Sequence, residues 1–327
     1  MEKYLAGFDI GGTKCAVILG KSVADSAPQI IAKERFATND HPEPAECLLY
    51  MCKLLQKLLL ECRIDKSLIH ALGISCGGPL DPYAGVIQSP PNLPGWDDVH
   101  AVELVENALQ IKTLLENDAN ACALAEWRYG AGRGTENMVF LTFGTGLGAG
   151  IIVNGRLLQG ACGMAGECGH IRLADDGPTG YGKAGSFEGF CSGGGIAQLG
   201  RQKAGEALQA NKPLAWCRSY EDLANVSAKT IAEAADNGDK TAQEVYAESG
   251  RKLGYGLSVL MDILNPERIV IGSVFARSEH LLRPAMEEVI RHEALPQCAQ
   301  SCQVVPAALG EAIGDIASLA IAGAYLP

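Results

Sequence analysis

The chain has 327 residues, of which 47% are hydrophobic and 20% are charged, and its formal net charge is −11. This length and composition predict a globular protein with two domains. The acidic charge argues against a nucleic acid or an anionic membrane surface as a main partner, although backbone N–H groups can still hold a phosphorylated ligand.

In chain order, the first part alternates strands and helices. An apolar run over residues 4–10 ends in Gly11-Gly12-Thr13, and a β-rich run over 15–19 follows, which predicts a hairpin with a glycine turn. The next predicted elements are a strand over 30–37, a helix over 42–62, a strand over 71–75, a loop over 89–96, a helix over 101–109 and a strand over 111–115.

The middle of the chain repeats its opening pattern. A strand over 138–143, the turn Gly144-Thr145-Gly146 and a strand over 148–153 resemble the opening strand–turn–strand, and this weak duplication predicts two facing lobes. The remaining predicted elements are helices over 119–129, 193–209, 229–236 and 241–264, strands over 269–271 and 303–305, and an apolar helix over 312–326. The lobes are expected to join near 116–120 and 308–312.

The chain has 12 cysteines at scattered positions and no C-x-x-C pair. In a chain of this length, this pattern predicts reduced and mostly buried thiols. Residues 1–10 lack the basic and apolar regions of a signal peptide, and no apolar run is long enough to span a bilayer. We therefore expect a cytoplasmic protein without a membrane partner.

Two glycine-rich turns carry groups suited to phosphate binding. Asp9 lies at the end of the first strand, where its carboxylate can hold Mg²⁺ through water while the N–H groups of the following turn face phosphate. In the second turn the glycines let the backbone approach an anion, and Thr145 adds a hydroxyl donor. Two such turns, one in each lobe, could clasp a triphosphate, whereas either turn alone is also consistent with an ordinary hairpin.

Asp118 is the candidate general base. It lies in Glu116-Asn117-Asp118-Ala119-Asn120, at a predicted strand-to-helix junction. A hydroxyl that accepts a phosphoryl group needs an aligned carboxylate to take its proton. The same residues are favoured N-caps, so the sequence also allows a purely structural interpretation in which they cap the next helix.

A further polar cluster lies in a glycine-dense stretch. Glu167 and His170 are flanked by glycines in Gly166-Glu167-Cys168-Gly169-His170, and Glu188 follows. Such side chains can hydrogen-bond several hydroxyls of one small polar ligand, although a lone histidine is more often structural.

The order of these motifs resembles the ROK (repressor, open reading frame, kinase) family of sugar kinases over essentially the whole chain. The first phosphate motif matches Gly7-Phe8-Asp9-Ile10-Gly11-Gly12-Thr13-Lys14, and the second matches residues 144–150. The sugar loops match Gly77-Gly78-Pro79 and Pro91-Asn92-Leu93-Pro94-Gly95-Trp96, the catalytic segment matches 116–120, and the family signature matches 166–170. The strand and turn on the nucleotide side match Ile269-Val270-Ile271-Gly272.

The resemblance implies a role for each of these residues. The implied catalytic base is Asp118. The implied sugar ligands are Gly78, Asn92, Asn117, Asp118, Glu167, His170 and Glu188. The implied nucleotide-side residues are Asp9, Gly11, Gly12, Thr13, Lys14, Gly144, Thr145, Gly146 and Gly272, with Mg²⁺ near Asp9.

The sequence departs from the family at a structural zinc site. The family builds that site from the signature histidine and three cysteines in a C-x-C-G-x-x-G-C-x-E pattern. Counted back from Glu188, the three cysteine positions hold Thr179, Tyr181 and Ser186. Tetrahedral zinc requires four good ligands, and hydroxyl groups are poor ones. We therefore expect no zinc, with the loop over 177–190 held by other packing.

The resemblance implies an α/β protein with an actin-like ATPase (ribonuclease H-like) fold, in which a ligand cleft lies between two lobes. The expected small N-terminal lobe spans 1–117, with a C-terminal helix at about 310–327 packed on it, and the larger lobe spans 118–309. The expected reaction is ATP-dependent phosphorylation of a hexose or N-acetylhexosamine at O6, with Asp118 as the base. The family further implies a homodimer.

Two other functions are compatible with the same skeleton. One is a sugar-sensing repressor, although the first phosphate motif begins at Gly7 and leaves no room before it for a helix-turn-helix domain. The other is a catalytically silent sugar-binding protein, against which the presence of Asp118 argues. The sequence does not separate glucose, N-acetylglucosamine, N-acetylmannosamine, fructose or allose as substrates, and it leaves polyphosphate open as an alternative donor.

Overall fold

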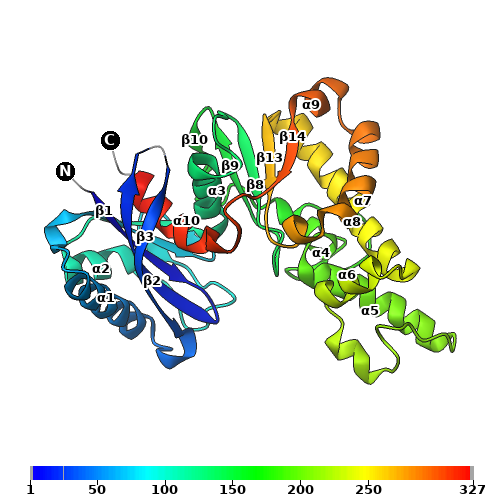
Figure 1. Cartoon of the computed structure of the whole chain (residues 1–327), viewed down its shortest axis with the longest axis horizontal. Coiled ribbons are helices and arrows are strands. Elements are labelled where there is room, and N and C mark those ends of the chain that lie inside the picture. Colours follow the sequence, from blue (N-terminus) through cyan, green and yellow to red (C-terminus); the bar gives the residue numbers. More distant parts are fainter. Residues whose placement is uncertain (1–2, 25, 325–327) are drawn as a thin grey trace. The chain divides into compact units, whose positions relative to one another are not determined.

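A computed structural model of the chain describes residues 3–24 and 26–324 (Figure 1). The chain divides into two compact units. The first comprises Met1–Thr135, Gly150–Gly166 and Ala308–Pro327, and the second comprises Glu136–Ala149 and Glu167–Ala307. The functional lobes expected over 1–117 and 118–309 stay a prediction. Within the described part of the chain, every helix is too short or too polar to cross a lipid bilayer.

The first unit is built on a five-stranded sheet with the order β3-β2-β1-β4-β7. Its strands are β1 (Tyr4–Ile10), β2 (Lys14–Val23), β3 (Ser26–Ala37), β4 (Ile69–Cys76) and β7 (Thr113–Asn117). Strands β1, β2 and β3 pair antiparallel, whereas β4 is parallel to both β1 and β7. The carboxyl ends of β1, β4 and β7 therefore meet at one edge of the sheet.

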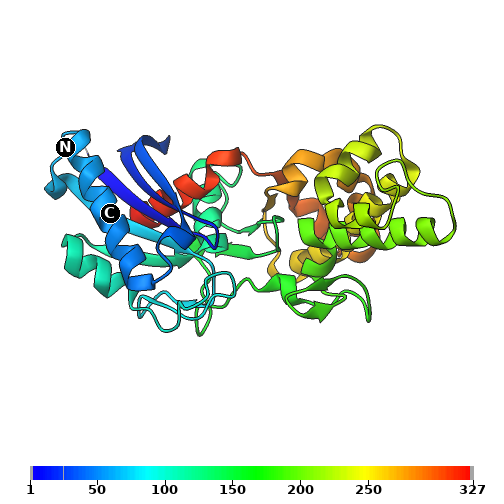
Figure 2. The same cartoon turned by 90° about the horizontal axis from the view of Figure 1, so that it is seen from below.

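Alternating side chains bury both faces of this sheet. On one face, Phe8, Val17 and Ile74 pack in a core with residues of α1 (Pro44–Glu61) and α2 (Ala101–Leu109). On the other face, Leu5 and Ile18 pack against α10 (Ile313–Ala324). Figures 1 and 2 show α1 and α10 on opposite sides of the strands.

Glycines allow α10 to lie unusually close to the sheet. A Cβ atom at Gly7 would lie 2.1 Å from Ser318 Oγ, and one at Gly73 would lie 2.1 Å from the Ser318 carbonyl oxygen. Helix α3 (Asp118–Tyr129) packs beside α10, and the first unit also contains the hairpins β5 (Leu80–Asp81) with β6 (Val86–Ile87) and β9 (Ala149–Val153) with β10 (Arg156–Leu157).

The second unit contains a parallel sheet and most of the helices. Its strands β8 (Met138–Leu141), β13 (Arg268–Ile271) and β14 (Gln303–Pro306) pair in parallel, with β13 between the other two. The other elements are the hairpin β11 (Thr179–Gly180) with β12 (Lys183–Ala184) and the helices α4 (Phe187–Phe190), α5 (Gly193–Gln209), α6 (Ala228–Asp236), α7 (Lys240–Leu264), α8 (Val274–Glu293) and α9 (Pro296–Ser301) (Figure 2). Helices α7 and α8 pack closely, because a Cβ at Gly250 would lie 2.5 Å from the Leu282 carbonyl oxygen.

Most of the strands and helices predicted from the sequence are present, with shifted ends. The helix predicted over 42–62 is α1, and the helix predicted over 241–264 is α7. The strand predicted over 111–115 runs instead over 113–117. Helices α8 and α9 were not predicted from the sequence. The terminal helix predicted over 312–326 is α10, and the end of that range lies outside the described residues.

Candidate functional site

The parallel strands bring three of the sequence motifs to one edge of the first unit. In the strand register Asp9 pairs with Ser75, which in turn pairs with Glu116. The next residue of β4, Cys76, pairs with both Ile10 and Asn117. The Asp9 carboxylate, the turn Gly77-Gly78 and the turn Asn117-Asp118 therefore lie at the ends of neighbouring strands.

The first phosphate turn is braced from outside the hairpin. Within the turn, the Gly11 amide donates to the Lys14 carbonyl at 3.1 Å. The hydroxyl of buried Thr38 donates to the Gly11 carbonyl at 2.6 Å, and the Thr38 amide donates to the Thr13 carbonyl at 3.0 Å. These bonds hold the turn in shape, while Thr13 and Lys14 keep exposed side chains.

Asn92, from the loop over 89–96, lies against the same turn. A Cβ at Gly12 would lie 2.4 Å from the Asn92 carbonyl oxygen, so glycine is needed for this close approach. A Cβ at Gly77 would lie 3.4 Å from Asn92 Oδ1, and one at Gly78 would lie 3.2 Å from Asn117 Nδ2. The structure thus brings the predicted sugar residues Gly78, Asn92 and Asn117 close to the predicted phosphate turn.

The turn Asn117-Asp118 has a well-defined hydrogen-bond pattern. Asn117 is the N-cap of α3, because its Oδ1 accepts from the amides of Ala119 at 2.9 Å and Asn120 at 3.4 Å. Asp118 Oδ1 also accepts from the Ala119 amide, at 2.8 Å. Asn117 therefore supplies the cap that the sequence could also have assigned to Asp118. The Nδ2 group of Asn117 lies next to Gly78.

Two carboxylates at this edge, those of Asp9 and Asp118, have raised pKa values. Desolvation raises the pKa of Asp9 to about 6, with further contributions from the negative charges of Asp118 and Asp315, whereas Lys33 and Arg35 lower it. Surrounding protein also raises the pKa of Asp118, against the lowering effect of the Ala119 amide, although the Asp118 side chain remains open to solvent. A raised pKa makes a carboxylate a stronger base, as proton abstraction requires.

The second unit contains the other glycine-rich turn. The Gly144 amide donates to the Gly146 carbonyl at 2.9 Å, and the Gly193 amide donates to the Gly144 carbonyl at 2.7 Å. Thr145 is exposed at the tip of the turn. Gly272 follows β13 and is buried against this region, since its amide donates to the Leu141 carbonyl at 2.9 Å.

The predicted sugar residues of the second unit lie next to this turn or on its supporting loop. Glu188, in α4, accepts from the Leu147 amide at 2.9 Å, so its carboxylate connects α4 to the glycine-rich turn. Gly169 is tightly packed there, since a Cβ would lie 2.2 Å from the Leu147 carbonyl oxygen. Glu167 and His170 flank this contact and have exposed side chains.

The positions that would replace the family's zinc ligands do not fit a zinc ion. Ser186 is fully buried, and its hydroxyl accepts from the Gly189 amide at 3.0 Å as the N-cap of α4. Tyr181 points into solvent with 70% of its surface exposed. Thr179 forms a reciprocal pair with Gln198, in which its amide donates to Oε1 and its carbonyl accepts from Nε2, both at 2.9 Å. The zinc content of the protein stays a prediction.

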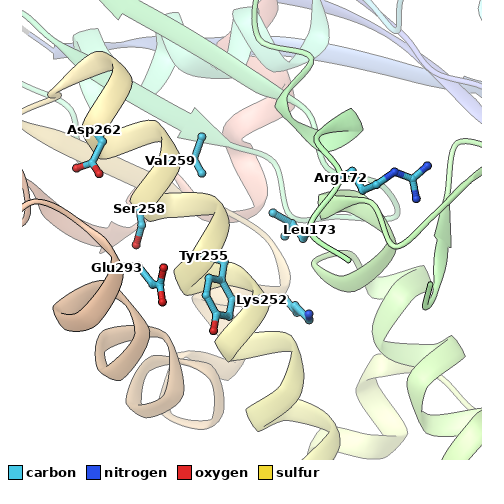
Figure 3. A pocket seen from close by; sticks show the side chains of 8 residues that line it. All are labelled: Arg172, Leu173, Lys252, Tyr255, Ser258, Val259, Asp262 and Glu293. Atoms are coloured by element: carbon cyan, nitrogen blue, oxygen red, sulfur yellow. The ribbon is translucent and has the colours of Figure 1, made fainter. Parts of the chain in front are cut away.

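A separate pocket of about 420 Å³ lies in the second unit (Figure 3). Its lining residues are Arg172, Leu173, Lys252, Tyr255, Ser258, Val259, Asp262 and Glu293. Arg172 donates to the Ala184 carbonyl at 2.9 Å, and Asp262 accepts from the Leu295 amide at 3.0 Å. Since these charged groups already bind the backbone and the pocket contains no predicted site residue, we assign it no part in the site.

The structure adds residues that sequence reasoning missed. Thr38 has no local signal, because its two bonds to the first phosphate turn span a whole strand pair. Ser273 adopts a φ of 55° after Gly272, and a Cβ at Gly144 would lie 3.6 Å from its Oγ. Glu116 could have been noticed as a charged residue at the end of an otherwise apolar strand, since it is only 5% exposed.

The comparisons with known proteins agree with these motifs. The ROK family model matches residues 5–324. A glucokinase from Halalkalibacterium halodurans is 32% identical over 317 residues, which cover 96% of this chain and 93% of that protein. Among solved structures, the ROK hexokinase from Thermus thermophilus is 26% identical with a TM-score of 0.78, and alignment covers 98% of each chain.

A ROK family glucokinase from Streptomyces griseus, solved in complex with glucose and AMPPNP, is 27% identical with a TM-score of 0.73, again over 98% of each chain. ROK kinases have the actin-like ATPase fold, so the fold class predicted from the sequence is confirmed. Because the family model spans nearly the whole sequence and these relatives are covered almost completely, the chain belongs to the ROK family.

Proposed function

We propose that the protein transfers the γ-phosphoryl group of ATP to the O6 hydroxyl of a hexose or N-acetylhexosamine, with Asp118 as the general base. The broader activity, an ATP-dependent sugar kinase, follows from extensive similarity to glucokinases and to a ROK hexokinase. The Streptomyces griseus relative was solved with glucose and AMPPNP, which supports a hexose and ATP as the ligands here.

The observation that carries the proposal is the position of Asp118. It begins α3 at the same sheet edge as Asp9, and the Asn117 cap together with the Ala119 amide holds its backbone and one carboxylate oxygen. Its side chain is open to solvent, so it can meet a substrate hydroxyl. A rigid, accessible carboxylate with a raised pKa is the arrangement that general-base catalysis needs.

In the proposed reaction, Asp118 accepts the proton of the sugar hydroxyl as the hydroxyl oxygen attacks the γ-phosphorus. The bond from that phosphorus to the bridging oxygen breaks, and ADP leaves with the bonding electron pair. Asp118 then returns its proton to water. When bound near Asp9 through water, Mg²⁺ would neutralise phosphate charge, and the partly buried carboxylate of Asp9 is compatible with a nearby cation.

The remaining proposed contacts divide between the two ligands. The proposed sugar contacts are Gly78, Asn92, Asn117, Glu167, His170 and Glu188, and the proposed nucleotide contacts are Gly11, Gly12, Thr13, Lys14, Gly144, Thr145, Gly146 and Gly272. Exposed Thr13, Lys14 and Thr145 have accessible donors for phosphate oxygens.

We further propose a homodimer, which light scattering on the purified protein would test.

The test is an assay of ADP release over glucose, N-acetylglucosamine, N-acetylmannosamine, fructose and allose, with ATP and polyphosphate as alternative donors. We expect turnover of at least one sugar with MgATP and none of its 6-deoxy analogue. Turnover of the 6-deoxy sugar would contradict transfer to O6. Sugar binding without turnover of any sugar would contradict the kinase and support a regulatory or non-catalytic ROK protein.

A further inference from the structure

We infer that Gln159 is a positioning residue, which ties the loop 160–165 to the turn Asn117-Asp118 through the carboxylate of Glu116. The kinetic part of this inference rests on the proposed function. The geometric part concerns only the first unit and stands on hydrogen bonds within it. Gln159 lies outside every motif identified in the sequence, and Glu116 lies within the segment 116–120 without an assigned role in binding sugar or nucleotide.

The carboxylate of Glu116 is the centre of the arrangement. Glu116 is the penultimate residue of β7 and is 5% exposed, so its two oxygens need partners within the protein. Oε1 accepts from the Asn117 amide at 2.9 Å and from Asn120 Nδ2 at 2.9 Å. Both donors belong to the turn and first helical residues around Asp118. Glu116 therefore holds the backbone before the proposed base and a side chain two residues after it.

The other oxygen of Glu116 accepts from a distant part of the chain. Gln159 Nε2, which lies 43 positions along the sequence, donates to Oε2 at 2.8 Å. The Gln159 carbonyl accepts from the Ala165 amide at 3.1 Å, so the same residue also closes the loop 160–165. One side chain thus connects the base of this loop to the turn that carries Asp118.

The loop also lies against the predicted sugar loops of the first unit. A Cβ at Gly163 would lie 2.9 Å from Pro82 Cδ and 3.5 Å from the Leu80 carbonyl oxygen. Leu80 begins β5, directly after the Gly77-Gly78-Pro79 turn. Along the chain the loop leads into Gly166 and Glu167, a proposed sugar ligand. The bond from Gln159 to Glu116 therefore fixes the start of the loop 160–165, which leads to Glu167, next to the turn that carries Asp118.

Removing only the Gln159 donor should affect sugar binding more than turnover. In Gln159→Leu the loop loses its tether, whereas the two bonds from Glu116 Oε1 to the Asn117 turn remain. We expect the KM for the sugar to rise about tenfold, in line with the loss of a hydrogen bond to a charged acceptor, while kcat stays within about threefold and the KM for ATP within about twofold.

An exchange of the two residues tests the pairing itself. Gln159→Glu places two carboxylates face to face, so it should lose at least as much as Gln159→Leu. In Glu116→Gln the Gln159 amide can rotate and accept from the new NH₂ group, so this variant should lose less than Gln159→Leu. In the double variant E116Q/Q159E, the new amide can still accept from Asn117 and Asn120 with its oxygen and can donate to the new carboxylate. We expect the double variant to recover a sugar KM within about threefold of the original protein.

The matched control is the exposed pair on α5, where Gln202 Nε2 donates to Glu206 Oε1 at 3.1 Å. Gln202→Leu removes a chemically identical bond and should leave every kinetic constant unchanged. A Gln159→Leu variant that matches this control, or an exchanged pair no better than the worse single variant, would overturn the inference.

Hydrogen–deuterium exchange separates this inference from the proposed function. The amides of residues 160–165 should exchange faster in Gln159→Leu than in the original protein, and faster than in Gln202→Leu, whether or not a sugar is turned over. Unchanged exchange in the loop would contradict the tether. Faster exchange in a protein that phosphorylates no sugar would support the tether and contradict the kinase.

Discussion

At the scale of single residues, the turn after β7 divides two tasks between neighbours. Asn117 supplies the helix cap through Oδ1, and Asp118 occupies the first helical position with an accessible carboxylate. Either residue could have been the cap on sequence grounds, because asparagine and aspartate are both favoured there. The cap on Asn117 leaves Asp118 available for chemistry, which is the division that the proposed mechanism requires.

Asp118→Asn should abolish most turnover and leave sugar binding nearly intact. The amide keeps the shape of the side chain but cannot accept a proton, so we expect kcat to fall roughly 10²- to 10⁴-fold. Steady-state kinetics and calorimetric sugar binding would measure the two effects. The control is Asp176→Asn at an exposed loop position. A near-normal kcat in Asp118→Asn would show that Asp118 is only structural.

Glu167→Gln and His170→Ala should each weaken sugar binding. Both side chains are exposed, and each loss would leave a sugar hydroxyl without its partner at a cost of about 1–3 kcal/mol. The measurement is the KM or Kd for the sugar at saturating ATP. An increase in the KM for ATP alone would place these residues on the nucleotide instead.

At the scale of elements, the loop over 177–190 is held by bonds that need no metal. The reciprocal Gln198–Thr179 pair ties β11 to α5, and the Ser186 cap starts α4. Lys183 Nζ donates to the His170 carbonyl at 2.7 Å, which links the loop to the segment that carries two proposed sugar ligands. The contacts of Thr179 and Ser186 lie at two of the positions where the family pattern places cysteines.

The purified protein should hold no stoichiometric zinc, and a chelator should leave its melting temperature unchanged. Hydroxyl groups at 179, 181 and 186 are poor zinc ligands, and Ser186 already accepts a hydrogen bond. Elemental analysis after dialysis gives the zinc content, with a zinc-binding ROK glucokinase as the positive control. About one zinc per chain would contradict the prediction and indicate a site built from other residues, such as Cys168 or Cys191.

At the scale of the whole molecule, the chain returns from the second unit to the first at Ala307 and Ala308. Glu126, fully buried on α3, receives this returning segment. Its carboxylate accepts from the amides of Ala308 at 3.2 Å and Leu309 at 2.8 Å, and from that of Ala131 at 2.7 Å. Because three backbone amides donate to this one buried carboxylate, the Glu126 side chain anchors the segment that begins at Ala308.

Glu126→Gln should lower the stability of the protein. The amide offers one acceptor oxygen in place of two and directs its NH₂ group toward backbone donors, so we expect a loss of about 2–3 kcal/mol in unfolding free energy. Urea denaturation followed by circular dichroism would measure it. The matched control is Glu288→Gln, which is exposed on α8 and should change stability by less than about 0.5 kcal/mol. Equal stability of the two variants would contradict the anchor.

The local sequence pattern was sufficient to predict most of the helices and strands and to identify the family. Leucines at helical spacing predicted α1, and glycine turns after short apolar runs predicted the two phosphate motifs. It failed at α8, because Pro284 and a charged surface interrupt the apolar spacing, and the backbone is itself non-helical at Ser278. The close packing of Gly250 against α8 then stabilises what propensity alone does not predict.

The arrangement around the proposed base depended on the tertiary structure. Motif spacing identified Asp9, Asn92 and Asp118 as candidates, yet only the parallel register of β1, β4 and β7 places their segments at one sheet edge. The bonds from Thr38 to Gly11 and from Gln159 to Glu116 join residues 27 and 43 positions apart. Helical and strand periodicities report only on neighbours within a few residues, so side-chain pairs of this separation become visible only when the packed sheet fixes where each segment lies.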